Sequence, residues 1–268
     1  MIEAVRKICW RLGRKLYCRA RMEQDNDPHH DGEYWLLAQM LNLSTGRVVV
    51  LDVGAHVGNW SAQAMALADQ TGKAIELYAF EPASATRRIL ERNLQPRAGF
   101  EISPLALSSA AGEAEFFSNA PGSGTNSLSP ASGAEKERVL VSTVDMWLEE
   151  HGVENVAMMK VDTEGYDFEV LKGAQRAIMQ GKFEVIQFEY NWRWLLNRAS
   201  LLNVFDFIRD KPYRIGKLVS DSIILYDAWH FEMDRYFEGN YVLVRSGGRI
   251  EALGRRATFD GCNTTVIE

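Results

Sequence analysis

The stretch that most constrains this fold is VVVLDVGAHVGNW, which runs from Val48 to Trp60. Four apolar residues that favour strands lead into Asp52, and Gly54 and Gly58 then bracket three residues. This order predicts a strand, a tight turn and a helix. In α/β proteins such a turn holds nucleotide-like ligands.

The rest of the chain alternates between strand-like apolar runs and helical patterns. Further strands are expected at residues 75–80, 100–106, 157–161, 183–188 and 241–245, with helices between them. Residues 108–133 are rich in glycine, serine and proline around a short strand, which predicts a hairpin insertion and a loop. The alternation predicts a mostly parallel sheet with helices on both faces.

Composition excludes several classes of protein. The 268 residues carry a net charge of −6, which disfavours a nucleic-acid partner. Three widely separated cysteines, Cys9, Cys18 and Cys262, suggest no disulfide framework or metal site, so a reducing, cytoplasmic location is expected. No apolar run reaches the ~18 residues that a bilayer span requires.

The first 21 residues differ from the rest in charge. They hold seven basic residues and one acid, a net charge of +6 that leaves −12 on the remainder. Apolar residues recur at three- and four-residue steps from Ile2 to Leu16, which predicts an amphipathic helix. Basic residues interrupt the stripe, so no secretory signal is expected. We expect this helix to pack on the main domain; contact with an anionic membrane surface is the alternative.

Acidic residues follow four of the expected strands. These are Asp52, Glu81, Asp162 with Glu164, and Glu189. In open α/β sheets ligands bind beyond the carboxyl ends of the strands. Any one of these acids could be a helix cap. Four on one rim instead indicate a cationic or hydroxyl-rich ligand, because crowded like charges are costly without one.

The spacing of the two glycines restricts the class of ligand that the turn could bind. Dinucleotide folds use G-x-G-x-x-G, whereas Gly54 and Gly58 give G-x-x-x-G, and Asp52 would repel a pyrophosphate. S-adenosylmethionine carries an ammonium, a sulfonium and no phosphate. Glu81, in YAFEP, can accept hydrogen bonds from ribose hydroxyls. These residues predict S-adenosylmethionine as the cofactor, with an NAD-dependent oxidoreductase as the alternative.

Several segments together resemble one family. VLDVGAHVGNWS, YAFEP, NSL, MMKVDTEGYDFEVLKGA and IQFEYN resemble the FkbM family of S-adenosylmethionine-dependent methyltransferases. The resemblance implies a class I, Rossmann-like sheet of seven strands, the last antiparallel, and methyl transfer to a hydroxyl of a sugar or secondary metabolite. Residues 45–246 would form the catalytic domain, after a helical extension and linker (1–44) and before a polar tail (247–268).

One position departs from the family pattern. Its glycine loop usually reads G-A-N-x-G, and His56 stands here in place of the asparagine. A base or substrate contact is one interpretation of His56. We favour the other, in which a neutral imidazole simply replaces the amide.

Candidate site residues follow from these placements. Cofactor contacts are expected from Asp52, Gly54, Ala55, His56, Gly58, Asn59, Glu81, Pro82, Leu105, Ala106, Asn126, Ser127 and Asp162. Acceptor contacts are expected from the aromatic segments, through Tyr190, Trp192, Trp229 and His230.

The chemistry is assigned to three carboxylates, Asp162, Glu164 and Glu189. They would orient the acceptor or take its proton, which requires pKa values raised by burial and like charges. Helix capping is the second interpretation and Mg²⁺ binding the third. Lys160, inside an expected strand, should pair with one of these acids.

Overall fold

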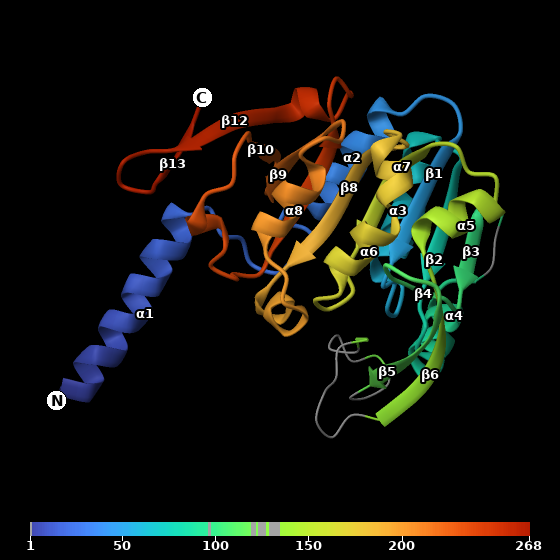
Figure 1. The fold of residues 1–268 in the computed structure, drawn as a ribbon, viewed down its shortest axis with the longest axis horizontal. Helices are drawn as coiled ribbons and strands as arrows, with labels where there is room; N and C mark the ends of the chain where they lie inside the picture. Colours follow the sequence, from blue (N-terminus) through green and yellow to red (C-terminus); the bar gives the residue numbers. More distant parts are fainter. Residues whose placement is uncertain (1, 96–97, 119–121, 123–126, 129–134) are drawn as a thin grey trace.

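The computed structural model describes residues 2–95, 98–118, 122, 127–128 and 135–268 (Figure 1). Within these residues a mixed sheet of ten strands runs through the molecule, in the order β13-β12-β10-β9-β11-β8-β7-β1-β2-β3. Its strands are β1 (Val48–Val53), β2 (Ile75–Phe80), β3 (Phe100–Ser103), β7 (Val156–Val161), β8 (Phe183–Tyr190), β9 (Tyr213–Val219), β10 (Ser222–Tyr226), β11 (Gly239–Arg245), β12 (Gly254–Phe259) and β13 (Thr265–Ile267).

The centre of this sheet is parallel. β3, β2, β1, β7 and β8 pair in parallel, and β11 lies antiparallel between β8 and β9. The register sets Asp52 of β1 beside Lys160 of β7. The carboxyl ends of β1, β2, β7 and β8 therefore meet at one rim.

Helices cover both faces of the sheet (Figure 1). The helices that lie on the body are α2 (Glu33–Leu43), α3 (Asn59–Thr71), α4 (Ser84–Asn93), α5 (Val144–Glu150), α6 (Asp167–Gly173), α7 (Gln175–Met179) and α8 (Leu201–Ile208), whereas α1 (Ile2–Ala20) projects from it. The 3-10 turns are η1 (Trp192–Asn197), η2 (Phe231–Met233) and η3 (Glu251–Leu253). Side chains of β1 alternate between the two apolar cores, because successive residues of a strand point to opposite faces. Val48 and Val50 pack with α2 and α3, whereas Val49 and Leu51 pack with α5 to α8.

The expected count of seven strands is wrong. In the described part of the chain β10, β12 and β13 extend the sheet beyond β9. Residues 247–268 were expected as a polar tail, yet β12 pairs in parallel with β10 and β13 pairs with β12. In β12 only Ala257 is buried, and the other side chains are partly or fully exposed to solvent. This exposure explains why the segment has a polar sequence although it forms a strand.

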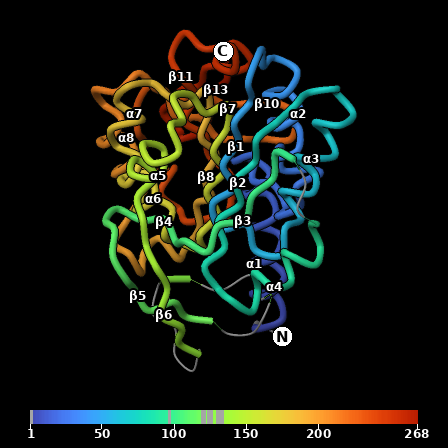
Figure 2. Tube along the Cα trace, turned by 90° about the vertical axis from the view of Figure 1, so that its right-hand side faces the viewer, coloured from blue at the N-terminus to red at the C-terminus, as the bar shows by residue number. Residues whose placement is uncertain are grey.

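A second, three-stranded sheet follows β3. It consists of β4 (Ala106–Leu107), β5 (Gly112–Ser118) and β6 (Glu135–Ser142), in the order β4-β6-β5. The β5–β6 pair is the hairpin expected from the sequence, and it extends past the body of the molecule in both views (Figure 2). An isolated bridge between Phe117 and Ser127 ties the following loop to β5.

The helix α1 projects from the body (Figure 1). Its apolar side chains Val5, Ile8, Leu12 and Leu16 are 53–63% exposed. The expectation that this stripe packs on the main domain is therefore wrong. By contrast α2 buries Leu36, Leu37, Met40 and Leu41. Among the described helices, none combines the length and the apolar character needed to cross a membrane.

Candidate active site

A pocket lies at the carboxyl ends of β1, β2 and β7, with a cavity volume of about 150 Å³. It is lined by Gly54, His56, Glu81, Pro82, Ala106, Leu107, Phe116, Leu128, Asp162, Thr163, Glu164 and Tyr166. Three of these side chains are carboxylates. Apolar groups from the second sheet close the other side, so the pocket has an acidic floor and an apolar wall.

The turn after β1 shapes the pocket floor. Gly54 has a φ of +87°, and a Cβ there would lie 1.9 Å from the carbonyl oxygen of Asp162. His56 also has a positive φ, 53°, in the left-handed region that asparagine and histidine tolerate better than most residues. This shared tolerance gives a physical reason why histidine can replace the asparagine of the family pattern.

Glu81 holds this turn in place. Its Oε2 accepts a hydrogen bond from the backbone N–H of His56 at 3.0 Å, and its Oε1 accepts one from Ala83 at 2.9 Å. Burial raises the pKa of Glu81 to about 7 against these hydrogen bonds. An ionised carboxylate has about four acceptor positions, so Glu81 retains capacity for a pair of ligand hydroxyls.

Asp52 lies behind the pocket and does not line it. The side chain is fully buried, and its Oδ2 accepts a hydrogen bond from Ser61 of α3 at 2.6 Å. Burial raises the pKa of Asp52, opposed by the charge of Lys160. The expected direct contact of Asp52 with the cofactor is therefore corrected to an indirect role: it packs the turn onto α3.

Lys160 is a buried cation among these acids. Its Nζ donates to Oδ2 of Asp162 at 2.8 Å, which confirms that it pairs with one of the strand-end acids. The negative charges of Asp162, Glu33 and Asp52 raise the pKa of Lys160, against the cost of burial. Lys160 therefore stays charged and keeps the carboxylate of Asp162 directed to the pocket.

Glu164 forms the second half of the rim after β7. Its φ is +57°, and its Oε2 lies 2.8 Å from Nη1 of Arg193. Burial, followed by the charge of Asp162, raises the pKa of Glu164 to about 7 although Arg193 opposes the shift. Asp167, fully buried, accepts a hydrogen bond from the N–H of Gly165 at 3.1 Å and so braces this turn.

Glu189 lies in a neighbouring pocket. That pocket is lined by Gln24, Asp25, Asn26, Asp31, Glu189, Lys217, Leu218, Glu238, Gly239 and Asn240. Burial raises the pKa of Glu189 well above its usual value, and the charges of Asp162 and Glu164 add to the shift. The three expected catalytic carboxylates therefore interact electrostatically, although Asp162 and Glu164 line one pocket and Glu189 lines the other.

The aromatic side chains expected to contact the acceptor lie elsewhere. None of the four lines the pocket of Asp162 or that of Glu189. Tyr190 is buried and donates to Asp234 at 2.7 Å, and Trp229 donates to the same carboxylate at 2.6 Å. His230 stacks on Phe259, with ring centroids 4.1 Å apart, and Trp192 is 53% exposed. Packing, as in a core, accounts for Tyr190, Trp229 and His230.

The expected cofactor contacts divide into two sets of equal size. Gly54, His56, Glu81, Pro82, Ala106 and Asp162 line the pocket. The residues Asp52, Ala55, Gly58, Asn59, Leu105 and Ser127 do not line it, and Asn126 lies outside the described residues. Ser127, for example, donates to the carbonyl oxygens of Thr163 and Glu164.

Some pocket residues were not expected from the sequence. Thr163 and Tyr166 line the pocket through the same turn as Glu164, and Arg193 of η1 pairs with Glu164 from outside the lining. Asp31, from the linker before α2, is buried beside Glu33, and both carboxylates accept hydrogen bonds from Asn240. The acids after Pro28 were the available signal, but a linker gives no periodicity that would place them.

The pocket fits S-adenosylmethionine. Nε2 of His56 and Oγ1 of Thr163, both in lining residues, are buried polar atoms without a hydrogen-bond partner in the structure. No arginine or lysine lines the pocket among the described residues, while Glu81, Asp162 and Glu164 do. Such a lining would repel a pyrophosphate and accept a ligand with an ammonium, a sulfonium and ribose hydroxyls.

The parallel centre, the glycine turn and the acidic rim define a methyltransferase-like α/β fold. The family model of the methyltransferase FkbM domain matches residues 52–215 of the chain. The protein therefore belongs to the FkbM family, whose model is that of a methyltransferase domain. This assignment sets aside the NAD-dependent oxidoreductase.

Solved structures of similar fold include methyltransferase FkbM from Methylobacillus flagellatus KT, 16% identical, with a TM-score of 0.47 over 78% of this chain and 47% of that one. An S-adenosylmethionine-dependent methyltransferase from Agrobacterium tumefaciens is 12% identical, with a TM-score of 0.44 over 81% and 62% of the two chains. This chain thus spans about half to three-fifths of their lengths. No match was found among curated proteins.

Proposed function

We propose that this enzyme transfers a methyl group to a hydroxyl of a sugar or a similarly polar small molecule or glycan. The observation that carries the proposal is Glu164, a pocket carboxylate whose pKa is raised to about 7. A hydroxyl acceptor must lose its proton during transfer, and a base is most effective when its pKa lies near the working pH.

The rim residues support separate roles. S-adenosylmethionine, when bound, supplies an electrophilic methyl group on its sulfonium. Asp162, paired with Lys160, accepts a hydrogen bond from the acceptor hydroxyl and orients it. Glu164 receives the hydroxyl proton as the oxygen gains the methyl group. Glu189, with Asp31 and Glu238 in the adjoining pocket, accepts hydrogen bonds from further hydroxyls of the acceptor.

The test compares hydroxyl with amine acceptors. Release of S-adenosylhomocysteine is measured with a panel of sugars and polyhydroxylated compounds and with amines of similar size. We expect turnover with a member of the first set, and a decrease of about 10²–10⁴-fold in Glu164→Gln with little change in cofactor affinity by calorimetry. Turnover confined to amines, or an unimpaired Glu164→Gln, would contradict the proposal.

A metal-assisted route is tested in the same assay. Among the described residues no group of three acidic, histidine or cysteine side chains is arranged to hold a metal ion. Activity that disappears with EDTA and returns with Mg²⁺ would assign the activation of the hydroxyl to a metal instead of Glu164.

We also propose that the protein works in the cytoplasm. The three cysteines are free in the structure, which suits the reducing, cytoplasmic location inferred from the sequence.

A further inference from the structure

The helix α1 presents an apolar stripe that the described part of the chain leaves uncovered. We define this stripe as Val5, Ile8, Leu12 and Leu16, which are 53%, 63%, 56% and 60% exposed. These residues recur at steps of three and four, so they lie along one side of the helix. We propose that α1 docks on an anionic lipid surface through this stripe.

The body of the protein contacts a different side of α1. Arg14 lies over the ring of Phe237, with the guanidinium carbon 5.9 Å from the centroid, and Tyr17 donates to Glu232 at 2.6 Å. At 100° per residue, Arg14 and Tyr17 lie roughly opposite the centre of the stripe. Docking of α1 to its own domain therefore leaves the stripe free for another surface.

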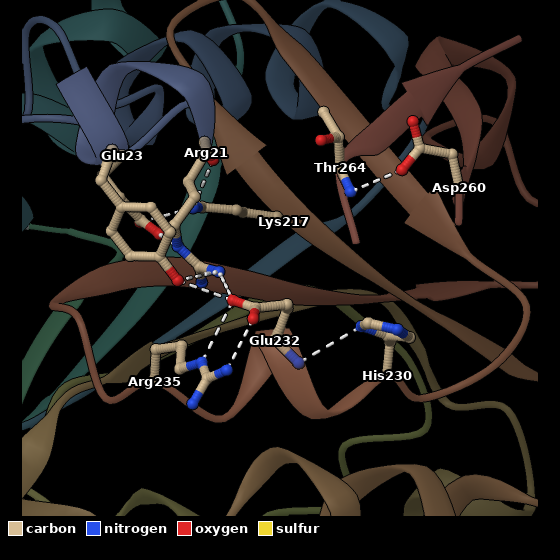
Figure 3. A network of polar contacts seen from close by, with 9 residues as sticks. Arg21, Glu23, Lys217, His230, Glu232, Arg235, Asp260 and Thr264 are labelled. Carbon is tan, nitrogen blue, oxygen red and sulfur yellow. Dashed lines mark hydrogen bonds and ion pairs between the residues drawn. The ribbon is translucent and has the colours of Figure 1, made fainter. Parts of the chain in front are cut away.

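A network of polar contacts holds the carboxyl-terminal end of α1 to the body of the protein (Figure 3). Glu232 accepts hydrogen bonds from Tyr17 and from Arg21, the latter at 2.9 Å, and pairs with Arg235 at 2.6 Å. Arg21 also pairs with Glu23, which in turn pairs with Lys217 of β9. This network fixes the direction in which the helix leaves the body, as an anchor to a surface requires.

The positive charge of residues 1–21 indicates an anionic partner for α1. Residues 1–21 carry seven basic side chains against one acid, while the remainder of the chain is strongly acidic. Lys15 and Arg11 flank the stripe, roughly 65° and 105° from its centre. Their long side chains can therefore snorkel to the lipid headgroups. A second copy of α1 would bring two segments of charge +6 together, and nucleic acid would leave the stripe in water.

The placement of α1 suits an enzyme at a surface. In both views its amino-terminal end points toward the end of the molecule that carries the β5–β6 hairpin, at which β8 terminates (Figures 1 and 2). The pocket opens at this same end, since its carboxylates follow β2 and β7. A membrane contact through α1 would thus bring the pocket toward the lipid side.

The experiment uses the full chain and sedimentation with two kinds of vesicle. One kind is phosphatidylcholine alone and the other contains about 30 mol% phosphatidylglycerol, which gives a negative surface potential. We expect binding to the second kind only. Leu12→Ser with Leu16→Ser should weaken it at least about tenfold. Arg11→Gln with Lys15→Gln should weaken it about 25-fold, near fivefold for each lost charge.

The matched control removes exposed apolar side chains elsewhere. Met146→Ser with Met179→Ser loses two residues of comparable exposure, 49% and 46%, on α5 and α7. This variant should bind the anionic vesicles within about twofold of the parent chain, because neither residue belongs to α1. Circular dichroism and the melting temperature of all variants should match the parent, since every changed side chain is exposed.

Three results would overturn the proposal. They are absence of binding to anionic vesicles, full binding by the stripe variant, and equal loss in the control variant. A stripe variant that instead converts a dimer to a monomer, with vesicle binding unchanged, would assign the stripe to a second copy of the chain.

Discussion

At the scale of single residues, Lys160 organises the charge of the site. It is 5% exposed, pairs with Asp162, and lies beside Asp52 in the neighbouring strand. A cation in this position offsets two carboxylates that would otherwise repel each other in a medium of low polarity. The buried lysine thus has a structural role that extends to the orientation of a pocket acid.

Removing that cation should destabilise the fold. Lys160→Met leaves Asp52 and Asp162 without their partner, and the loss of one member of a buried pair costs about 3–5 kcal/mol. Urea unfolding monitored by fluorescence should show this decrease, and adding Asp52→Asn should recover part of it. The matched change Lys136→Met removes an exposed ion pair with Glu115 and should cost about 1 kcal/mol or less.

The pH dependence of activity should report Glu164. A base acts in its deprotonated form, so a carboxyl with a pKa of about 7 is inactive below that pH and active above it. We expect kcat/KM to rise between about pH 6 and 8, measured by S-adenosylhomocysteine release. In Glu164→Gln the residual activity should lose this rise. A profile that is the same in both proteins would assign the ionisation to another group, such as Glu189.

The carboxylates of the rim could be predicted because each directly follows an apolar run, and parallel strands bring such positions together. The indirect role of Asp52 could not be predicted, because the sequence does not reveal whether a strand-end acid faces a ligand or the first turn of the helix that follows, here α3. The packing of the aromatic residues could not be predicted for a similar reason. Tyr190 and Trp229 share one half-buried acid, Asp234, which is 44 residues from Tyr190 in the chain.

At the scale of elements, the turn between β1 and α3 makes the tightest contact of the site. Gly54 needs a positive φ and also lies against the backbone of Asp162 after β7. Glycine is therefore required at this position for two reasons: the backbone has a positive φ, and the neighbouring carbonyl oxygen leaves no space for a Cβ.

These two demands can be separated by two alanine variants. Gly46 has a positive φ of +79° but open space where a Cβ would lie, so Gly46→Ala should cost only the backbone strain, about 1 kcal/mol. Gly54→Ala adds a clash with a carbonyl oxygen and should cost at least about 2 kcal/mol more by urea unfolding. Equal costs for the two variants would show that the turn after β1 can move away from Asp162.

The central strands were predictable from their apolar runs, whereas the strands at one side of the sheet were not. β9 contains Arg214 and Lys217, which interrupt its apolar pattern. Their partners are distant in sequence: Asp227 and Glu251 for Arg214, and Glu23 for Lys217. Charged residues that are neutralised only by tertiary contacts conceal a strand from any local pattern.

At the scale of the whole molecule, Glu232 joins the first helix to a segment more than two hundred residues later. The neighbouring Arg235, followed by Tyr17 through its hydrogen bond, lowers the pKa of Glu232 to about 2. A carboxyl with a depressed pKa stabilises the folded arrangement above its unfolded value of about 4.3. That stabilisation is lost as the pH falls toward 2.

Neutralising this carboxyl should loosen α1 without unfolding the domain. In Glu232→Gln the ion pairs with Arg21 and Arg235 are absent, so trypsin should cleave at residues 19–21 several-fold faster at pH 7. Glu154→Gln, which breaks an exposed pair with Lys182, serves as the matched control. Cleavage at the same rate in all three proteins would mean that the ring contacts with Phe237 hold the helix by themselves.

The projection of α1 has a consequence for how this enzyme would meet its acceptor. A helix of nineteen residues is about 28 Å long, comparable with the diameter of a small domain. An enzyme held to a sheet of lipid by such an arm searches in two dimensions, and its rate follows the number of acceptors per unit area instead of their bulk concentration. For a glycan acceptor carried on a lipid, dilution with inert lipid would then slow the reaction, whereas diluting the whole suspension with buffer would change it far less.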